Sequence, residues 1–317
     1  MSGDGLRHGV ELSNLDQPLF DRAEATKADL VNYLEFAGER LLRVLRGRPL
    51  SVVRVRPGQE PFTQKNLPKY TPEWVARTTV WAQSSRREIS YALCDDLRTL
   101  IWFANQRAVE YHPTLFHADS APEPTHLVLD LDPSPGQSFA DAVAGARLIR
   151  EALAADGLAG AVKTSGSRGL HVFVPVVAGI DVEDAAAATR AIAARAERID
   201  PSVGTTAFIR EDRQGKVFLD ATRAGGATVA AAYSPRIRPG ATVSFPLRWS
   251  DLDGVSPADF TLRTVPELIG DNDPWQSEMP ALQELPRDLI EEGHTIPVAR
   301  VQAMHEGKRR ARARREE

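Results

Sequence analysis

Residues 126–132 read HLVLDLD, and this stretch decides the fold. Leucine and valine side chains that fill such a short run predict a buried strand. Successive side chains of a strand point to opposite faces. The three leucines are therefore predicted to share one face of the strand, whereas Asp130 and Asp132 share the other.

Helical and strand patterns alternate after this strand. Ser138 is the expected N-cap of the first helix, and Gly166 and Gly169 mark a turn between two of the strands. The resulting order, β-α-β-β-α-β, is that of the split βαβ or ferredoxin-like unit. Its expected elements after the first strand cover residues 138–155, 160–164, 170–176, 181–199 and 216–220.

The residues before this unit predict an N-terminal α/β part. Thr26 and Asp29 fit a capping box, and leucines at helical spacing predict a helix over residues 27–46. The apolar run at 50–55 predicts a strand, which ends at the break Pro57-Gly58.

We therefore expect an α+β fold in a single domain of residues 1–317. Residues 232–250, which are rich in Pro, Ser and Arg, predict a loop or an edge strand. The basic tail at 308–315 would either bind phosphate nonspecifically or serve as a disordered, solubilising end. The expected parts are an N-terminal α/β subdomain at about 1–125, an RRM/ferredoxin-like catalytic module at about 126–250 and a C-terminal segment at about 251–317.

The composition limits the classes of protein to consider. A formal net charge of -4 and a pI of about 6.0 argue mildly against a nucleic-acid partner, although local basic clusters can still bind phosphates. The single cysteine, Cys94, excludes a disulfide or a cysteine zinc site within the chain. Because the sequence shows neither an apolar run of about 18 residues nor a secretory leader, we expect a cytoplasmic protein without a membrane partner.

A third carboxylate, Asp220, ends the last predicted strand. In a ferredoxin-like sheet the first strand lies between the third and the fourth, which would place Asp220 beside Asp130 and Asp132. Three carboxylates on neighbouring strands suit two divalent ions about 3.5–4 Å apart. The alternative for the Asp130/Asp132 pair is that it faces water or caps the following turn.

Two further stretches carry cations and small polar residues. Residues 164–171 read TSGSRGLH, in which glycines, hydroxyls and Arg168 suit phosphate binding. An ordinary hairpin turn is the alternative, and the stretch lacks the ending of a Walker loop. Arg236 and Arg238 alternate onto one face and would either neutralise a triphosphate or form a solvated edge.

Together these motifs resemble the archaeo-eukaryotic primase superfamily, and within it the polymerase domain of bacterial non-homologous end-joining ligase D. The similarity is greatest to the free-standing mycobacterial and actinobacterial primase-polymerases (Prim-Pol C type). It extends from Leu15-Asp16 to about Leu252. It implies that Asp130, Asp132 and Asp220 are the catalytic ligands of two Mn²⁺ or Mg²⁺ ions. The nucleotide contacts that it implies are His112, Ser165, Arg168, His171, Arg236 and Arg238.

The resemblance also identifies candidate DNA contacts, with departures. The end-joining relatives bind a downstream 5′-phosphate. Lys27 matches one of their basic contacts, and Gln17 stands where they carry a cation. Phe62 matches the first of two phenylalanines that stack on template bases, whereas Thr63 replaces the second. The candidate DNA contacts are Lys27, Arg54, Phe62 and Lys65.

A last departure follows Asp220, where Ala221-Thr222-Arg223-Ala224 replaces a motif that usually holds an aromatic residue and an asparagine. The resemblance implies a template-dependent polymerase that fills short gaps or ends in DNA during repair. Its substrates would be gapped or primer-template DNA with NTPs or dNTPs. Because the ligase motif Lys-x-Asp-Gly is absent, a separate ATP-dependent DNA ligase is the expected partner. The alternatives are de novo priming and a non-catalytic module that binds DNA ends or gaps and recruits a ligase.

Overall fold

The structure is a computed structural model that describes residues 5–82, 86–224 and 227–298. The described residues form two compact units. Within the described ranges, no helix is long and apolar enough to cross a membrane. The predicted basic tail at 308–315 lies outside these ranges. The first unit comprises 1–123, 163–167 and 228–278, and the second comprises 124–162, 168–227 and 279–317.

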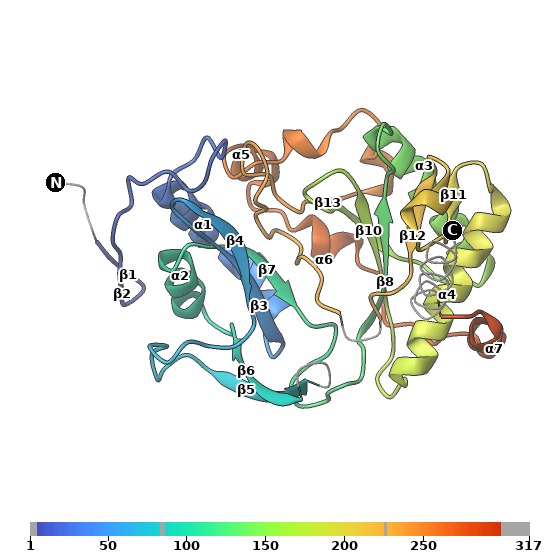
Figure 1. Cartoon of the computed structure of the whole chain (residues 1–317), viewed down its shortest axis with the longest axis horizontal. Helices are drawn as coiled ribbons and strands as arrows, with labels where there is room; N and C mark the ends of the chain where they lie inside the picture. Colours follow the sequence, from blue (N-terminus) through green and yellow to red (C-terminus); the bar gives the residue numbers. More distant parts are fainter. Residues whose placement is uncertain (1–4, 83–85, 225–226, 299–317) are drawn as a thin grey trace, which may run out of the picture. The chain divides into compact units, whose positions relative to one another are not determined.

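The second unit is built on an antiparallel sheet with β8 (His126–Asp132) at its centre. β10 (Leu170–Pro175) pairs with one edge of β8, and β12 (Val217–Asp220) pairs with the other (Figure 1). The first predicted strand of the unit therefore lies between the third and the fourth, as expected. The short strand β11 (Gly204–Thr205) extends the sheet beyond β12, and β9 (Ala161–Thr164) runs from this unit into the first.

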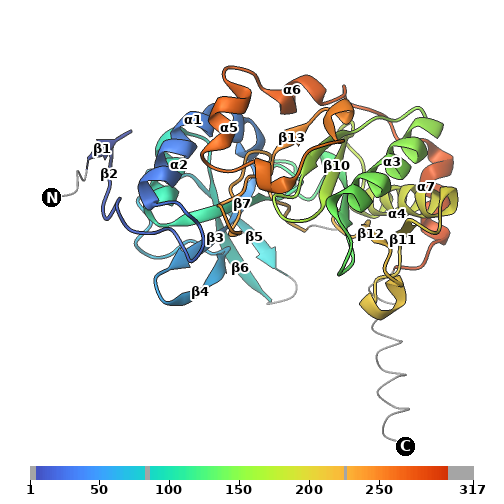
Figure 2. The same ribbon diagram turned by 90° about the horizontal axis from the view of Figure 1, so that it is seen from above.

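Helices α3 (Phe139–Ala155) and α4 (Val182–Ile199) cover one face of this sheet (Figure 2). Ser138 is the N-cap of α3, as expected, and it forms a capping box with Asp141. All the elements predicted between residues 126 and 220 end within one residue of their expected bounds. The leucines of β8 are fully buried. Because they are buried on the helix-covered face, the other face is left to the aspartates.

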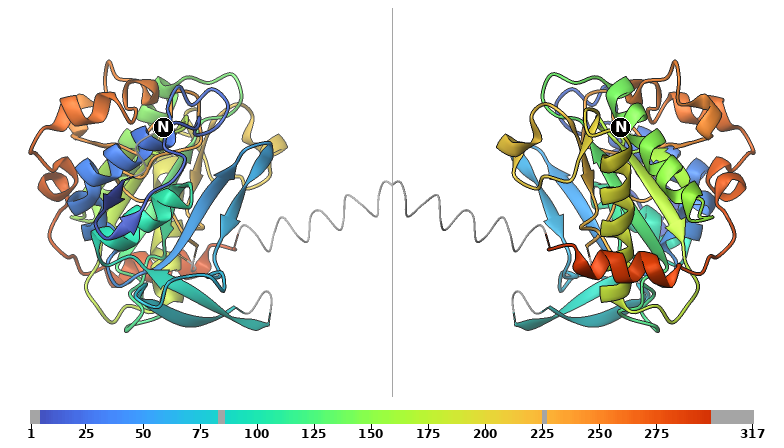
Figure 3. Two further views of the ribbon diagram at one scale, coloured as in Figure 1. Left: turned by 90° about the vertical axis from the view of Figure 1, so that its left-hand side faces the viewer. Right: turned by 90° about the vertical axis from the view of Figure 1, so that its right-hand side faces the viewer.

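Helix α7 (Arg287–Thr295) crosses α4, as Figure 3 shows. Gly293 is the contact point, since a Cβ atom there would lie 1.9 Å from the carbonyl oxygen of Ala187. Only glycine permits this approach of two backbones. Arg195 joins the same two helices and also α3, because it binds Asp156 and Glu292. Helix α7 thus completes the helical layer of the second unit.

The first unit contains a five-stranded sheet. Tyr111 of β7 meets Phe103 of α2 edge to face with ring centroids 6.4 Å apart, which marks the face that packs on the helices. The predicted helix and strand at 27–46 and 50–55 occur as α1 (Lys27–Leu45) and β3 (Pro49–Arg56), and Thr26 and Asp29 form the capping box. The other main elements are β4 (Gln59–Gln64), β5 (Arg77–Ala82), β6 (Arg87–Leu93), α2 (Leu97–Asn105) and β7 (Ala108–Pro113).

Residues 228–278 return to the first unit, mainly as turns and isolated bridges. The stretch predicted as a loop or edge strand contains β13 (Pro246–Leu247) and is anchored where the Tyr33 hydroxyl donates to the carbonyl oxygen of Tyr233 at 2.8 Å. The remaining short elements of the described chain are β1 (Leu6–Arg7), β2 (Val10–Glu11), η1 (Arg210–Arg213), η2 (Trp249–Asp251), η3 (Pro257–Asp259), α5 (Thr264–Ile269) and α6 (Pro274–Glu278).

Candidate active site

The sheet of the second unit brings the predicted site residues Asp130, His171 and Asp220 side by side. Asp130 on β8 lies directly opposite His171 on β10 and Asp220 on β12. Asp132 follows two residues later on the same face. Asp130 and Asp220 are only 7% and 5% exposed, whereas Asp132 is exposed at the end of the strand. The adjacency expected for a ferredoxin-like sheet is thus confirmed.

Two nitrogen-bearing side chains contact the buried carboxylate of Asp130. His171 Nε2 lies 3.3 Å from Asp130 Oδ1, and one terminal nitrogen of Arg223 lies 2.7 Å from Asp130 Oδ2. The same nitrogen is 3.3 Å from Asp220 Oδ2. Burial alone would raise the pKa of Asp130, but His171 and Arg223 hold it well below its ordinary value. Sequence reasoning noted Arg223 only as a departure from the family motif and missed this pairing.

The pKa of Asp132 is shifted in the opposite direction from that of Asp130. Partial burial, together with the negative charges of Asp130 and Asp220, raises the pKa of Asp132 to about 6 even though Arg223 opposes the shift. Like charges this close disfavour ionisation of one another. A cation bound to the three carboxylates would remove that repulsion.

The donor set fits a divalent ion, although the side chains are not yet arranged around one. In the part of the chain that the structure describes, no group of three or more His, Cys, Asp or Glu side chains stands ready to hold a metal ion. The guanidinium of Arg223 lies on Asp130 and Asp220, the two buried carboxylates. Hard carboxylate oxygens on one sheet face are the ligands that Mg²⁺ and Mn²⁺ prefer. Asp130, Asp132 and Asp220 would hold such an ion once Arg223 is displaced.

The glycines of the 164–171 turn have packing roles. A Cβ atom on Gly169 would lie 2.0 Å from the carbonyl oxygen of Leu131, which belongs to the strand of the aspartates. Gly166 has a φ of 69°, which favours glycine, and lies against the backbone of Ser244. Arg168 donates to the Pro133 carbonyl at 3.2 Å. The turn is therefore fitted closely to the end of β8.

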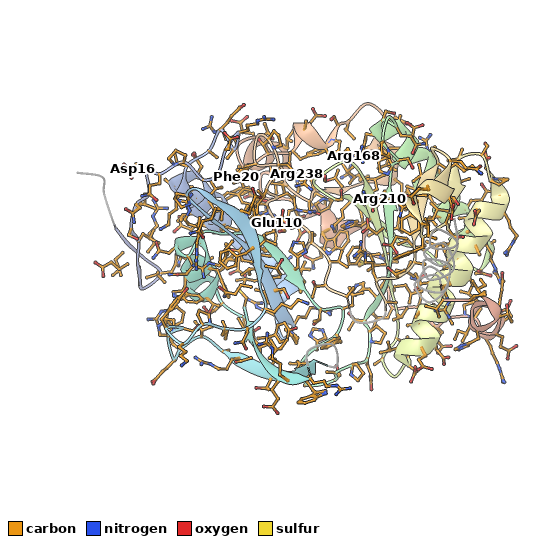
Figure 4. The ribbon with its side chains drawn as sticks, viewed as in Figure 1. Asp16, Phe20, Glu110, Arg168, Arg210 and Arg238 are labelled. Carbon is orange, nitrogen blue, oxygen red and sulfur yellow. The ribbon has the colours of Figure 1, made fainter. Side chains whose placement is uncertain are left out.

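A second cluster of predicted residues lies in the first unit, around the buried Glu110, which Figure 4 labels. Its carboxylate accepts from His112 Nε2 at 2.8 Å and from the Ile237 N–H at 2.9 Å. It also pairs with Arg236 Nε at 3.2 Å. Arg236 in turn donates to the Ser165 carbonyl. Arg238, also labelled in Figure 4, donates to the Ser167 hydroxyl at 3.0 Å and completes the cluster.

Glu110 was missed as a site residue by sequence reasoning. Burial would raise the pKa of Glu110, but the hydrogen bond from His112, the charge of Arg236 and the Ile237 N–H lower it to about 2. Burial, together with the charges of Arg236 and Lys163, lowers the pKa of His112 although Glu110 opposes the shift, and Nε2 of the imidazole donates to Glu110. Arg236 and Arg238 outnumber the single carboxylate, which suits the binding of an anion.

Comparisons with known proteins identify the family of the chain. The chain matches the family described as LigD, primase-polymerase domain, over residues 26–275. It belongs to that family. This confirms the resemblance to the ligase D polymerase domain and the primase-polymerase fold. The assignment rests on more than three quarters of the chain, and both clusters described above fall within the matched range.

Individual members of the family are similar along most of this primase-polymerase chain. The multifunctional non-homologous end joining DNA repair protein LigD of Mycobacterium tuberculosis is 33% identical over 262 residues, which are 79% of this chain and 34% of that protein. The bifunctional LigD of Bacillus subtilis is 31% identical over 265 residues, 82% of this chain and 42% of that protein. The chain thus spans well under half the length of these relatives.

A solved structure matches the fold of the primase-polymerase chain as a whole. The polymerase domain of Mycobacterium tuberculosis ligase D in complex with DNA superposes with a TM-score of 0.78 at 31% sequence identity. The match covers 87% of this chain and 100% of that domain.

The four predicted DNA contacts of this family member differ in their exposure to solvent. Lys27 is 2% exposed, and its ammonium donates to the Ser13 carbonyl and to Asn105 Oδ1 at 2.5 and 2.6 Å. Arg54 is 7% exposed and donates to the Gln106 carbonyl at 2.8 Å. The other two predicted contacts, Phe62 and Lys65, are half-buried and exposed, respectively. All four remain predictions as DNA contacts, but only the last two present their side chains to solvent.

A cleft of about 780 Å³ opens in the first unit of the primase-polymerase. The turn at 55–61 and the segment 17–21, to which the labelled Phe20 of Figure 4 belongs, line it. Arg107, which also lines it, donates to Gln17 Oε1 at 3.2 Å. A guanidinium therefore lies beside Gln17.

Proposed function

We propose that the chain is a template-dependent nucleotidyltransferase that fills short gaps or ends in DNA during repair. The observation that carries this proposal is the row formed by Asp130, Asp132 and Asp220 on one face of the sheet. A scaffold has no need for three adjacent carboxylates, whose repulsion lowers stability unless a cation is near. Membership of the LigD primase-polymerase family supports the same reaction class.

The proposed reaction is phosphoryl transfer. The 3′-hydroxyl oxygen of a primer forms a bond to the α-phosphorus of a nucleotide, and the bond from that phosphorus to the bridging oxygen of the β-phosphate breaks. Pyrophosphate leaves, and the hydroxyl proton passes to solvent. Two divalent ions, Mn²⁺ or Mg²⁺, supply positive charge for the attacking and leaving oxygens when bound. Asp130, Asp132 and Asp220 are the proposed ligands.

The proposed nucleotide contacts are the charged and polar side chains that the family resemblance identifies. Guanidinium groups bind phosphate oxygens through paired hydrogen bonds, which is the role we assign to the arginines among them. His171 is held by Asp130, and Glu110 holds His112 and Arg236, so these side chains are oriented before the substrate binds. The full set is His112, Ser165, Arg168, His171, Arg236 and Arg238.

Gapped or primer-template DNA is the proposed nucleic-acid substrate, since a similar domain was solved with DNA. The half-buried Phe62 is the candidate for stacking on a base, and the exposed Lys65 is the candidate for phosphate contact. Arg107 is the candidate for the downstream 5′-phosphate, because its guanidinium lies beside Gln17. We further propose that residues 1–317 act as one domain and that a separate ATP-dependent DNA ligase seals the product.

One observation favours a second candidate, a non-catalytic module that binds DNA gaps and recruits a ligase. Arg223 pairs with both Asp130 and Asp220, so one positive charge offsets part of the carboxylate repulsion without a metal ion. In that case the row would be a structural feature of the sheet.

Primer extension on a gapped duplex with a downstream 5′-phosphate separates the two candidates. The assay uses Mn²⁺ with NTPs or dNTPs, and compares the wild type with the Asp130→Ala/Asp132→Ala protein. Binding of the same duplex is measured by fluorescence anisotropy. The polymerase proposal predicts extension by the wild type alone and equal binding by both. Equal binding without extension by either protein would favour the scaffold.

A further inference from the structure

Arg223 lies three residues after Asp220, in the turn that follows β12. A single terminal nitrogen of its guanidinium bridges Asp130 Oδ2 and Asp220 Oδ2, at 2.7 and 3.3 Å. Both carboxylates are almost fully buried, whereas the Arg223 side chain is 32% exposed. The cation therefore reaches the carboxylates from the solvent side of the row, where a metal ion would also enter.

The hydrogen bonding of Arg223 is incomplete. Its Nε is buried and has no hydrogen-bond partner among the residues that the structure describes. A buried donor without an acceptor is unfavourable. The arginine is thus attracted by the charge of the row, without the paired geometry that would fix it there.

A structural arginine of the same unit provides the comparison. Arg195 binds both oxygens of Asp156 through one nitrogen, and its Nε donates to Glu292 at 2.7 Å. That arginine uses its fork to join three helices. Arg223 instead places one nitrogen between two carboxylates, as a bridging cation would lie.

We propose that Arg223 is an internal counter-ion that competes with divalent metal ions for Asp130 and Asp220. It stabilises the carboxylate row when no metal is bound, and it weakens metal binding because it must be displaced. This inference rests on the proposed function, since it takes the row to be a metal site. It predicts that the metal affinity of the chain is set by a residue that is not itself a ligand.

Titration with Mn²⁺, followed by the electron paramagnetic resonance signal of the free ion, tests the proposal without any catalytic readout. The proteins are residues 1–317 of the wild type and the variants Arg223→Ala, Arg223→Gln, Arg198→Ala and Asp130→Ala/Asp132→Ala. Arg198 is the matched control, because it pairs with Glu292 at 2.7 Å away from the row and its removal changes the net charge equally. Arg223→Gln retains most of the side-chain volume if the alanine variant folds poorly.

We expect both Arg223 variants to bind Mn²⁺ at least about tenfold more tightly than the wild type. The reason is that each variant removes a competing charge that lies 2.7 and 3.3 Å from the two carboxylates. The affinity of Arg198→Ala should match that of the wild type. In EDTA, the Arg223 variants should melt at a lower temperature than Arg198→Ala, and Mn²⁺ should restore them. An unchanged or weaker Mn²⁺ affinity of folded Arg223 variants, beside clear binding by the wild type, would overturn this proposal alone. Binding by no variant above the level of Asp130→Ala/Asp132→Ala would overturn the metal site of the proposed function as well.

Discussion

Replacement of Glu110 by glutamine removes the carboxylate that holds the first-unit cluster. The pKa of Glu110 is lowered from 4.5 to about 2. Each factor of ten in acid dissociation corresponds to ~1.4 kcal/mol, so the ionised carboxylate contributes ~3 kcal/mol to the folded state. The group is buried, with an 8% exposed side chain, so solvent does not screen these contacts. We therefore expect Glu110→Gln to lower the free energy of unfolding by ~3 kcal/mol at pH 7.

The lowered pKa of Glu110 determines how its contribution to stability changes with pH. Because the folded pKa is depressed, the contribution is fully present above the unfolded pKa of 4.5 and is lost as pH falls toward about 2. Urea denaturation gives the difference in the free energy of unfolding between the wild type and Glu110→Gln. This difference should be constant from pH 7 to pH ~5, and at pH ~3.5 it should be smaller by ~1 kcal/mol.

Glu291→Gln is the matched control, since Glu291 is exposed and pairs only with Arg287 in the described structure. It should change the free energy of unfolding by less than about 0.5 kcal/mol at every pH. A Glu110→Gln difference below about 1 kcal/mol at pH 7, or one that does not change with pH, would refute the electrostatic account of the cluster.

Three further substitutions follow from close contacts. Gly293→Ala should lower the free energy of unfolding by about 1–3 kcal/mol, because its Cβ would meet the Ala187 carbonyl, and an unchanged urea midpoint would contradict the helix crossing. Gly169→Ala should displace the strand of the aspartates through Leu131, so that Mn²⁺ binding by the folded protein weakens; retained binding would show that the row tolerates the shift. Arg107→Ala should weaken binding of a gapped duplex with a 5′-phosphate more than one with a 5′-hydroxyl, measured by anisotropy. An equal loss for both duplexes would remove Arg107 from phosphate recognition.

The strand and helix bounds of the second unit could be predicted because their signals are local. The alternation in residues 126–132 fixes which side chains share a face, and Ser138 with Asp141 fixes the start of the next helix. The position of Asp220 beside Asp130 followed from the expected strand order of the ferredoxin-like unit. These features depend on neighbours in sequence or on one rule of topology.

The remaining site features depend on contacts that are distant in sequence. Lys27 begins a helix and could be expected to face solvent, but Asn105, 78 residues later, accepts from its ammonium. Glu110 lies two residues before His112, but its partners Arg236 and Ile237 follow more than 100 residues later, so the sequence around it reveals no role. Arg223 has no local pattern that would reveal its pairing with Asp130. Such contacts need the folded chain.

Diffraction from crystals grown with Mn²⁺, gapped DNA and a non-hydrolysable nucleotide, recorded at a wavelength where manganese scatters anomalously, tests the central claim most directly. The account predicts anomalous peaks at about 2.0–2.2 Å from the carboxylate oxygens of Asp130, Asp132 and Asp220. It also predicts that Arg223 has left the position between Asp130 and Asp220. Manganese bound elsewhere, with Arg223 still paired to both carboxylates beside the bound nucleotide, would contradict the assignment of this row as the catalytic metal centre.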